Sequence, residues 1–402
     1  MKKKNSIYSL ITIILLLIPI YQPKLFTQYD TLKVIYAIAN VLLFIFLFIK
    51  NKMIILKKNS FNLHIFWLIY RFYLLFMMFI NNNMIYFFQW ANLTLMVLNL
   101  ILLFEKCEKE NKVKPLLMAI SIIGIVMLTI NFITLILFPR GIIRSDFFDL
   151  ADNDWYFLGI KTQFSNIMFG TIAASGTLYI LNKNKKNLFI VIATIISILL
   201  NIFYKNLATP VVGMIIIIIM IIFNKIKSLR YNIYLLFWLS IFISVLVINF
   251  GVVEIFSYFI TSILHKSMSL SSRTLIWQNA RDVIFNQDLF FTIFGNGEFY
   301  SFVPYDGRML NAHNEILTIF YNSGIIGSIL LLSFFLRCFK GYNQRNNKAI
   351  QFIYIICFAE LIMMITEEYL ATAICYVPFL LLPYISNYIS NVDRNELCVF
   401  KY

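Results

Sequence analysis

Residues 207–223, LATPVVGMIIIIIMIIF, contain no charged side chain, and Lys205 and Lys225 flank them. A helix needs about 17–25 mostly apolar residues to cross the hydrocarbon core of a bilayer. In lipid only helices and closed barrels satisfy their own backbone hydrogen bonds, and a continuous apolar run lacks the alternation of a barrel strand. This stretch therefore predicts a membrane-spanning helix.

The same pattern recurs along the chain, which has 402 residues, 60% of them hydrophobic and 13% charged. Soluble domains carry about 25% charged residues, so this composition excludes a soluble protein. We predict an all-α integral membrane protein with about twelve transmembrane helices, built as a single polytopic domain over residues 1–402. The predicted spans are residues 7–22, 33–49, 63–80, 84–104, 115–138, 164–181, 187–204, 207–223, 232–250, 314–336, 350–367 and 369–388.

Positive charge sets the orientation of these spans. With a cytoplasmic N-terminus, the inside segments hold 23 of the 34 lysine and arginine residues and the outside segments hold 10. Basic residues concentrate in cytoplasmic loops, so both termini are predicted to be cytoplasmic in a multi-pass protein of the cell membrane. The first run lacks a small-x-small cleavage site and is interpreted as an uncleaved span. The net charge of +15 reflects these tracts and does not indicate a nucleic-acid partner.

Two predicted outside loops are long enough to carry function, residues 139–163 and residues 251–313, the second between spans nine and ten. The longer loop ends in His313. At about 100° per residue, Gly324 and Gly327 lie on the same side of a helix as His313. We therefore expect His313 to cap the outer end of span ten, above a strip of small residues. The alternative is that the glycines only permit close helix packing and that the histidine lies at an interface.

Three residues of the same loop, Arg273, Trp277 and Arg281, have the spacing of one flank of a short helix. We expect their two guanidinium groups to stack around the indole. The alternative is an amphipathic helix on the membrane surface. Residues 295–297, Gly-Asn-Gly, could turn backbone amides towards an anion, although such a pair of glycines is far commoner as a plain turn.

Further basic residues are predicted at the outer membrane boundary. Arg140, Arg144 and Lys161 lie in the loop of residues 139–163, and Lys205 follows span seven. Lysine and arginine are natural partners of a pyrophosphate on a lipid anchor. The alternative is that they contact phospholipid or anchor the helices at the interface.

Ionisable residues at membrane depth are usually paired or functional, which marks Arg71 and Glu360. Glu367 and Glu368, at the outer end of span eleven, are expected to pair with outside basic groups. The chain has no nucleotide-binding glycine loop and no serine elbow. With only three histidines, a histidine-rich metal site is not expected either. We therefore predict neither a cofactor nor a metal.

Several of these motifs together resemble the O-antigen polymerase and O-antigen ligase family, which also has about twelve spans and one large outside loop before a late span. The similarity of motifs covers about residues 270 to 327; elsewhere the likeness is one of topology and loop order. The residues that carry it are Arg273-x-x-x-Trp277, Gly295-Asn296-Gly297 and His313-Asn314-x9-Gly324-x-x-Gly327.

The resemblance implies a metal-independent, inverting glycosyltransferase that takes a glycan from undecaprenyl diphosphate and joins it to an acceptor sugar on the outer face of the membrane. It places His313 at the family's catalytic histidine and Arg273 at a diphosphate-binding arginine. Lys205 stands near a basic residue that the family has within a serine-arginine pair, whereas this chain has Tyr204-Lys205. The wider candidate set adds Arg281, Arg140 and Arg144 for the diphosphate, and Asn314, Trp277, Gly324 and Gly327 as supporting residues.

The leading hypothesis is thus a polymerase of lipid-linked repeat units that makes capsular or other surface polysaccharide. Its expected partners are the lipid-linked donor and acceptor, membrane lipids, a flippase and a chain-length regulator. The alternatives are a ligase that moves a finished glycan to a lipid or protein acceptor, a flippase for lipid-linked oligosaccharides, and a structural membrane subunit. The richness in asparagine, isoleucine, lysine, phenylalanine and tyrosine favours a low-GC bacterium with a capsule.

Overall fold

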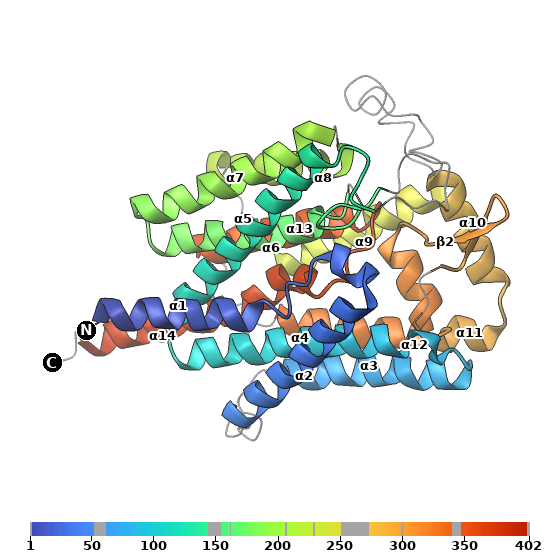
Figure 1. Cartoon of the computed structure of the whole chain (residues 1–402), viewed down its shortest axis with the longest axis horizontal. Coiled ribbons are helices and arrows are strands. Elements are labelled where there is room, and N and C mark those ends of the chain that lie inside the picture. Colours follow the sequence, from blue (N-terminus) through green and yellow to red (C-terminus); the bar gives the residue numbers. More distant parts are fainter. Residues whose placement is uncertain are drawn as a thin grey trace.

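The computed structural model describes residues 2–51, 62–143, 154–160, 162–205, 207–227, 230–250, 273–298, 301–339 and 347–399. Within these residues the chain is a bundle of helices with one short hairpin at its edge (Figure 1). The long helices are α1 (Lys2–Leu17), α2 (Asp30–Lys50), α3 (Leu63–Ile80), α4 (Phe87–Lys109), α5 (Val113–Leu137), α6 (Ser165–Leu181), α7 (Lys185–Lys205), α8 (Ala208–Lys227), α9 (Ile233–Phe250), α12 (Glu315–Cys338), α13 (Lys348–Met363) and α14 (Val377–Val399). Short 3-10 helices, η1 (Lys24–Gln28), η2 (Met84–Tyr86) and η6 (Ala373–Tyr376), lie between some of them.

Each of the twelve apolar runs overlaps one of these long helices. In the described part of the chain, eight helices are long and apolar enough to cross a membrane. Six of them are the single helices α2, α3, α5, α7, α8 and α12. The other two are α4, which η2 extends at its start, and α14, which η6 extends at its start. Shorter apolar helices cover Tyr8–Leu17, Ser165–Leu181 and Ile233–Asn249. The structure therefore agrees with the prediction of an all-α membrane protein.

The outward surface of the bundle is apolar. Phe79, Phe189 and Phe203 are each 70% exposed, which suits contact with lipid chains. The centre is occupied by α6 and α13, whose residues are mostly buried. Small side chains allow these two helices to pack closely, and a Cβ on Gly176 of α6 would lie 2.3 Å from the ring of Phe352 in α13.

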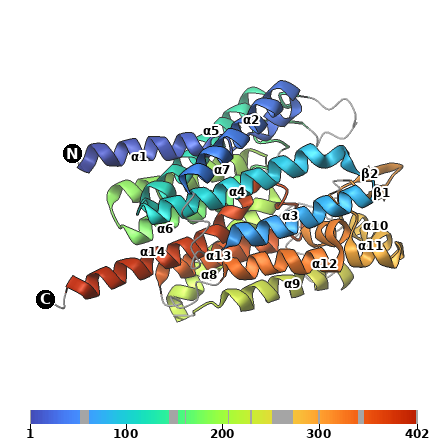
Figure 2. The same ribbon diagram turned by 90° about the horizontal axis from the view of Figure 1, so that it is seen from below.

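The two ends of the bundle differ. Helix α1 begins and α14 ends at the same end, which we call the terminal end (Figure 2). At the opposite end, the loop end, lie α10 (Arg273–Asn286), α11 (Leu289–Phe294) and the antiparallel hairpin of β1 (Val303–Tyr305) and β2 (Arg308–Leu310). A second apolar core, which includes Trp277, Phe302 and Leu317, joins α10 and the hairpin to α12.

The eleventh predicted span extended too far. Helix α13 ends at Met363, and residues 364–372 form a loop before η6. The backbone in this loop binds the beginning of α12 instead of continuing a helix: the amide of Glu315 donates to the carbonyl of Met364 over 2.9 Å. Glu367 and Glu368 are thereby brought to the loop end of α12.

Candidate functional site

The beginning of α12 is held in place by Asn314, the residue after His313. The side-chain oxygen of Asn314 accepts a hydrogen bond from the amide of Leu317 at 3.0 Å, and its amide nitrogen donates to the carbonyl of Ile365 at 2.8 Å. Asparagine is a favoured N-cap residue because it satisfies an amide of the first helical turn. The expectation that His313 itself caps this helix was wrong, since Asn314 does so.

His313 lies just before the helix in a left-handed backbone conformation, with φ of +46°. This conformation is uncommon for residues other than glycine and is frequent where a side chain must be aimed at a site. The imidazole is partly buried. Burial, then the positive charge of Arg273, lower the pKa of His313, while the nearby carboxylate of Glu367 acts in the opposite direction. The ring is therefore neutral at neutral pH and able to accept a proton.

Arg273, the first residue of α10, contacts the loop after α13. Its Nη2 lies 2.7 Å from Oε1 of Glu367, and both side chains are largely buried. Of the two acidic residues expected to pair with basic groups of the predicted outside loops, Glu367 does so, with Arg273. The ion pair leaves one cation and one anion beside His313, so the immediate surroundings of the imidazole carry no large net charge.

Two more carboxylates complete the acidic side of the site. Oε2 of Glu315 accepts hydrogen bonds from the amides of Tyr369 and Leu370, at 2.7 and 3.0 Å. Glu368 accepts from the hydroxyl of Thr318 at 2.9 Å. Burial, followed by the negative charge of Glu315, raises the pKa of Glu368 to about 8. A carboxyl with this pKa is mostly protonated at neutral pH, which reduces repulsion within the cluster.

A small cavity of about 50 Å³ with mixed polar and apolar lining opens between these residues and α3. A buried water needs about 10–15 Å³ and two to four polar partners, so several waters fit. Four ionisable side chains line the cavity, which are Arg71, Glu298, Glu315 and Glu368. The cavity shares Glu315, Glu368 and Thr318 with the loop end of α12, and His313, Arg273 and Glu367 are not part of its lining.

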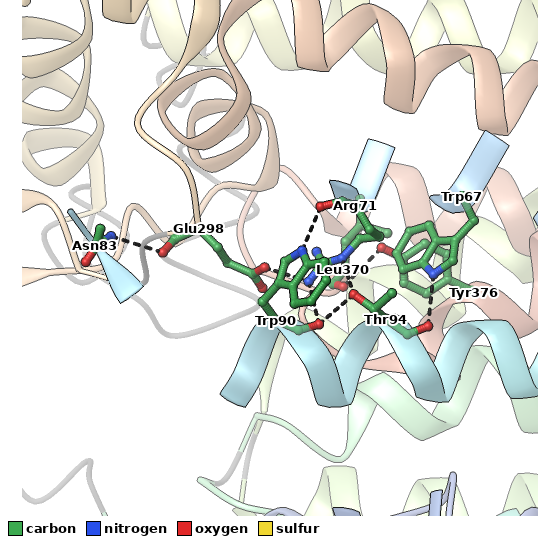
Figure 3. A network of polar contacts seen from close by, with 8 residues as sticks. All are labelled: Trp67, Arg71, Asn83, Trp90, Thr94, Glu298, Leu370 and Tyr376. Carbon is green, nitrogen blue, oxygen red and sulfur yellow. Dashed lines mark hydrogen bonds and ion pairs between the residues drawn. The ribbon is translucent and has the colours of Figure 1, made fainter. Parts of the chain in front are cut away.

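Arg71 lines this cavity, and Figure 3 shows the polar contacts around its side chain. Its Nη2 lies 2.6 Å from Oε2 of Glu298 and 3.0 Å from the carbonyl of Trp90, and its Nε donates to the hydroxyl of Thr94 at 2.8 Å. The side chains of Arg71 and Glu298 are only 3% and 6% exposed. Buried charges need such partners, and Arg71, which the sequence marked as either paired or functional, is paired with Glu298.

The Gly-Asn-Gly turn and the glycines of α12 form one structural unit. Helix α12 breaks at Gly324, which has φ of 58° and ψ of −165°, a region that glycine alone adopts readily. The carbonyls of Tyr321 and Asn322, near the break, accept the amides of Asn296 and Gly297 at 3.0 and 2.9 Å. The prediction that small residues form a strip along one face of a straight helix was therefore wrong, because α12 is not continuous at Gly324.

Close packing explains why glycine occupies these positions. A Cβ on Gly295 would lie 2.4 Å from the carbonyl oxygen of Asn322. One on Gly324 would lie 2.5 Å from the amide nitrogen of Gly295, and one on Gly327 would lie 2.6 Å from the ring of Tyr73 in α3. In addition, the hydroxyl of Tyr73 donates to the carbonyl of Phe294 at 2.6 Å. The turn therefore fastens α11 to α3 and α12, and its amides bind protein carbonyls rather than an anion.

The expected stack of Arg273, Trp277 and Arg281 is not formed. Trp277 is 1% exposed and belongs to the second apolar core. Arg273 binds Glu367, whereas Nη1 of Arg281 lies 3.2 Å from the side-chain oxygen of Asn249 in α9. Arg281 thus ties α10 to α9 and is directed to a different partner from that of Arg273.

Lys205 does not belong to the site around His313 and Arg273. The ammonium group of Lys205 donates to the carbonyl of Pro139 at 3.0 Å and lies 5.0 Å from the ring centre of Tyr156. It contacts the loop of residues 139–160 and neither His313 nor Arg273. Arg140 is exposed in that same loop. Arg144 and Lys161 lie outside the described residues.

Sequence reasoning missed Glu298 and Glu315 as members of the site. For Glu315 the available signal was its position, as a charged residue at the start of an apolar run. For Glu298 the sequence offered no signal, because its partner Arg71 is 227 positions away. In the described part of the chain no group of three or more His, Cys, Asp or Glu side chains could hold a metal ion.

The arrangement joins a neutral base, a cation held by a carboxylate, and hydrogen-bonding groups at the end of the membrane helices. Such a site can accept a proton from a hydroxyl at His313 and stabilise negative charge at Arg273. Within the described residues no hydrogen bond of the His313 imidazole is recorded, and the residue is partly exposed. No protein-family model, curated protein or solved structure matches this chain.

Proposed function

We propose that this protein is a membrane glycosyltransferase that polymerises undecaprenyl-diphosphate-linked repeat units into capsular or other surface polysaccharide. The observation that carries the proposal is the meeting of His313, Arg273 and Glu367 at the loop end of α12. A charged lipid carrier holds its diphosphate at the boundary of the membrane, and a site at the ends of the membrane helices is suited to that depth. The excess of basic residues in the predicted inside segments supports an outer location for the loop end.

The chemistry is a single displacement. The acceptor sugar hydroxyl attacks the anomeric carbon of the donor, and its proton passes to a ring nitrogen of His313. The bond from the anomeric carbon to the diphosphate oxygen breaks, and the diphosphate leaves with the electron pair. Arg273 stabilises the negative charge on the departing oxygen, while Glu367 holds the guanidinium in position. One displacement inverts the anomeric centre.

A ligase that transfers a finished glycan would use the same three residues. The two activities differ in the acceptor, which is a second lipid-linked unit for a polymerase and a lipid or protein for a ligase. We keep the polymerase as the leading proposal because the composition favours a capsule-forming bacterium.

One observation favours a transporter as a second candidate. Transporters often bind their cargo at broken helices near mid-membrane, and α12 is broken at Gly324. Here, however, amides of the Gly-Asn-Gly turn occupy the carbonyls next to the break. Those carbonyls are not available to cargo, which leaves the enzyme as the stronger proposal.

The decisive experiment is transfer by the purified protein. It is incubated in detergent or nanodiscs with a lipid-linked repeat unit, and the products are separated on a gel. A ladder supports a polymerase, a single transfer product supports a ligase, and no product with measurable movement of the lipid between leaflets supports a transporter. Transfer that persists in a metal chelator supports the metal-independent mechanism, whereas loss that a divalent cation restores contradicts it.

The matched variant for the base is His313→Asn. Asparagine tolerates the left-handed backbone at this position but cannot accept a proton near neutral pH, so the protein should fold and lose transfer. Arg308→Ala, in the exposed strand β2 of the same loop, serves as the control and should retain transfer. Wild-type transfer rates from His313→Asn would remove His313 from catalysis.

A further inference from the structure

A second cavity lies at the terminal end of the bundle, opposite the loop end. It occupies about 230 Å³ between the second half of α1, the end of α2 and the turn from α4 to α5. One buried water needs about 10–15 Å³ of such space, so the cavity is large enough for a polar headgroup. Its lining consists of Ser9, Thr12, Ile13, Leu16, Lys50, Leu103, Lys106, Cys107, Glu110 and Lys112. We call it the terminal pocket.

The terminal pocket carries an excess of positive charge. Three lysines, at positions 50, 106 and 112, face one carboxylate, Glu110. Lys112 is neutralised by Glu110, since its Nζ lies 2.5 Å from Oε2. Neither Lys50 nor Lys106 forms an ion pair with a carboxylate in the described part of the chain. The ammonium of Lys106 instead lies 4.8 Å from the ring centre of Phe46. Two positive charges therefore remain for an anion from outside.

The rest of the pocket is apolar and borders the lipid-facing surface. Ile13, Leu16 and Leu103 form part of its wall. The helices that contribute to it also expose apolar residues to the surroundings of the bundle, with Leu15 of α1 60% exposed and Ile49 of α2 61% exposed. A ligand with a phosphate and an attached hydrocarbon chain would satisfy both parts. A free phosphate would use only the lysines.

We propose that the terminal pocket binds the phosphate headgroup of an anionic phospholipid. Basic pockets between transmembrane helices on the cytoplasmic side are suited to such headgroups, and the terminal end is the side predicted to be cytoplasmic. The lipid phosphate lies between Lys50 and Lys106, and an acyl chain runs along the apolar wall. The site is separate from His313 and does not depend on the proposed transferase activity.

The test measures lipid binding by the intact protein. Purified protein is reconstituted in nanodiscs of phosphatidylcholine, or of phosphatidylcholine mixed with phosphatidylglycerol, and the retained lipids are identified by native mass spectrometry after extraction. The variant is Lys50→Gln/Lys106→Gln. The matched control is Lys185→Gln/Lys186→Gln, because these two lysines are exposed at the start of α7 and lie on the same predicted side of the membrane.

We expect the wild-type protein to retain phosphatidylglycerol in preference to phosphatidylcholine. The Lys50→Gln/Lys106→Gln variant should bind phosphatidylglycerol about thirtyfold more weakly, since each lysine near a phosphate contributes about five- to sixfold. The control should bind as the wild type does. Equal loss in both variants, or no loss in either, overturns the proposal. Displacement of phosphatidylglycerol by inorganic phosphate at comparable concentration also overturns it, because the pocket would then be a site for free phosphate.

Discussion

The ion pair of Arg71 and Glu298 offers the sharpest test of how the loop end is joined to the membrane helices. Its two side chains come from α3 and from the segment after α11, and they are 3% and 6% exposed. The substitution Glu298→Gln keeps the shape of the side chain and removes its charge. The variant leaves the buried guanidinium of Arg71, which lines the cavity, without the carboxylate of Glu298.

The size of the effect follows from burial. Removing one partner of a buried ion pair costs about 3–5 kcal/mol because the other charge stays desolvated. Arg71 would keep the hydroxyl of Thr94 and the carbonyl of Trp90, so we expect a loss near the lower limit, about 3 kcal/mol. That corresponds to roughly a hundredfold change in the unfolding equilibrium.

The assay is unfolding of the purified protein in mixed micelles with increasing denaturing detergent, followed by tryptophan fluorescence. Trp67 and Trp90 lie 5.4 and 5.9 Å from the guanidinium of Arg71 and report on its surroundings. The control is Glu110→Gln, which breaks the ion pair with Lys112. That pair is about 40% exposed on both sides, and exposed pairs contribute about 0–1 kcal/mol.

A double-mutant cycle completes the test. Arg71→Met alone leaves the carboxylate of Glu298 buried without this guanidinium, whereas Arg71→Met with Glu298→Gln removes both charges of the pair. The double variant should therefore lose less stability than the two single losses added together, by about 2 kcal/mol or more. If the losses add to within about 0.5 kcal/mol, the two side chains do not interact and the reasoning is refuted.

Three further predictions concern the pH dependence and the backbone of the site. The transfer rate should fall at acidic pH, below the ordinary histidine pKa of 6.5, because His313 becomes protonated there. Glu367→Gln should move this fall in kcat/KM to lower pH, because the substitution removes the negative charge that raises the pKa of His313. A shift of the kcat/KM profile to higher pH would contradict this. The pKa of Glu368, raised to about 8 from 4.5, means that its carboxyl weakens the folded state as pH rises from about 5 to 8. Glu368→Gln should therefore have a Tm advantage over the wild type that grows across this range, and a constant difference would argue against the raised pKa. Gly324→Ala should lower stability by about 2 kcal/mol or more, from both backbone strain and contact with Gly295. Gly307→Ala is its control, since Gly307 also has positive φ but no atom within 4 Å of a Cβ, and similar losses in the two variants would show that close packing at Gly324 contributes little.

The membrane helices could be predicted because their cause is local. A backbone in lipid must satisfy its own hydrogen bonds, so every long apolar run becomes a helix wherever it lies in the fold. Residues 63–80 were predicted as a span and form α3 with the same bounds. The prediction failed at residues 364–367, where binding to the start of α12 was stronger than the helical tendency of an apolar run.

For the residues of the site, too, some features follow from the local sequence and others only from the tertiary structure. The sequence by itself determined that the chain is helical and apolar, and that Arg71 and Glu367 needed partners, because unpaired charges are costly in or near lipid. Tertiary structure alone decided which partners they found. Glu298 lies 227 positions from Arg71, and Arg273 lies 94 positions from Glu367. Tertiary structure also brought Gly295 against Gly324, the residue at which α12 is broken. Contacts over such separations depend on how whole helices pack, and no local pattern of residues specifies that packing.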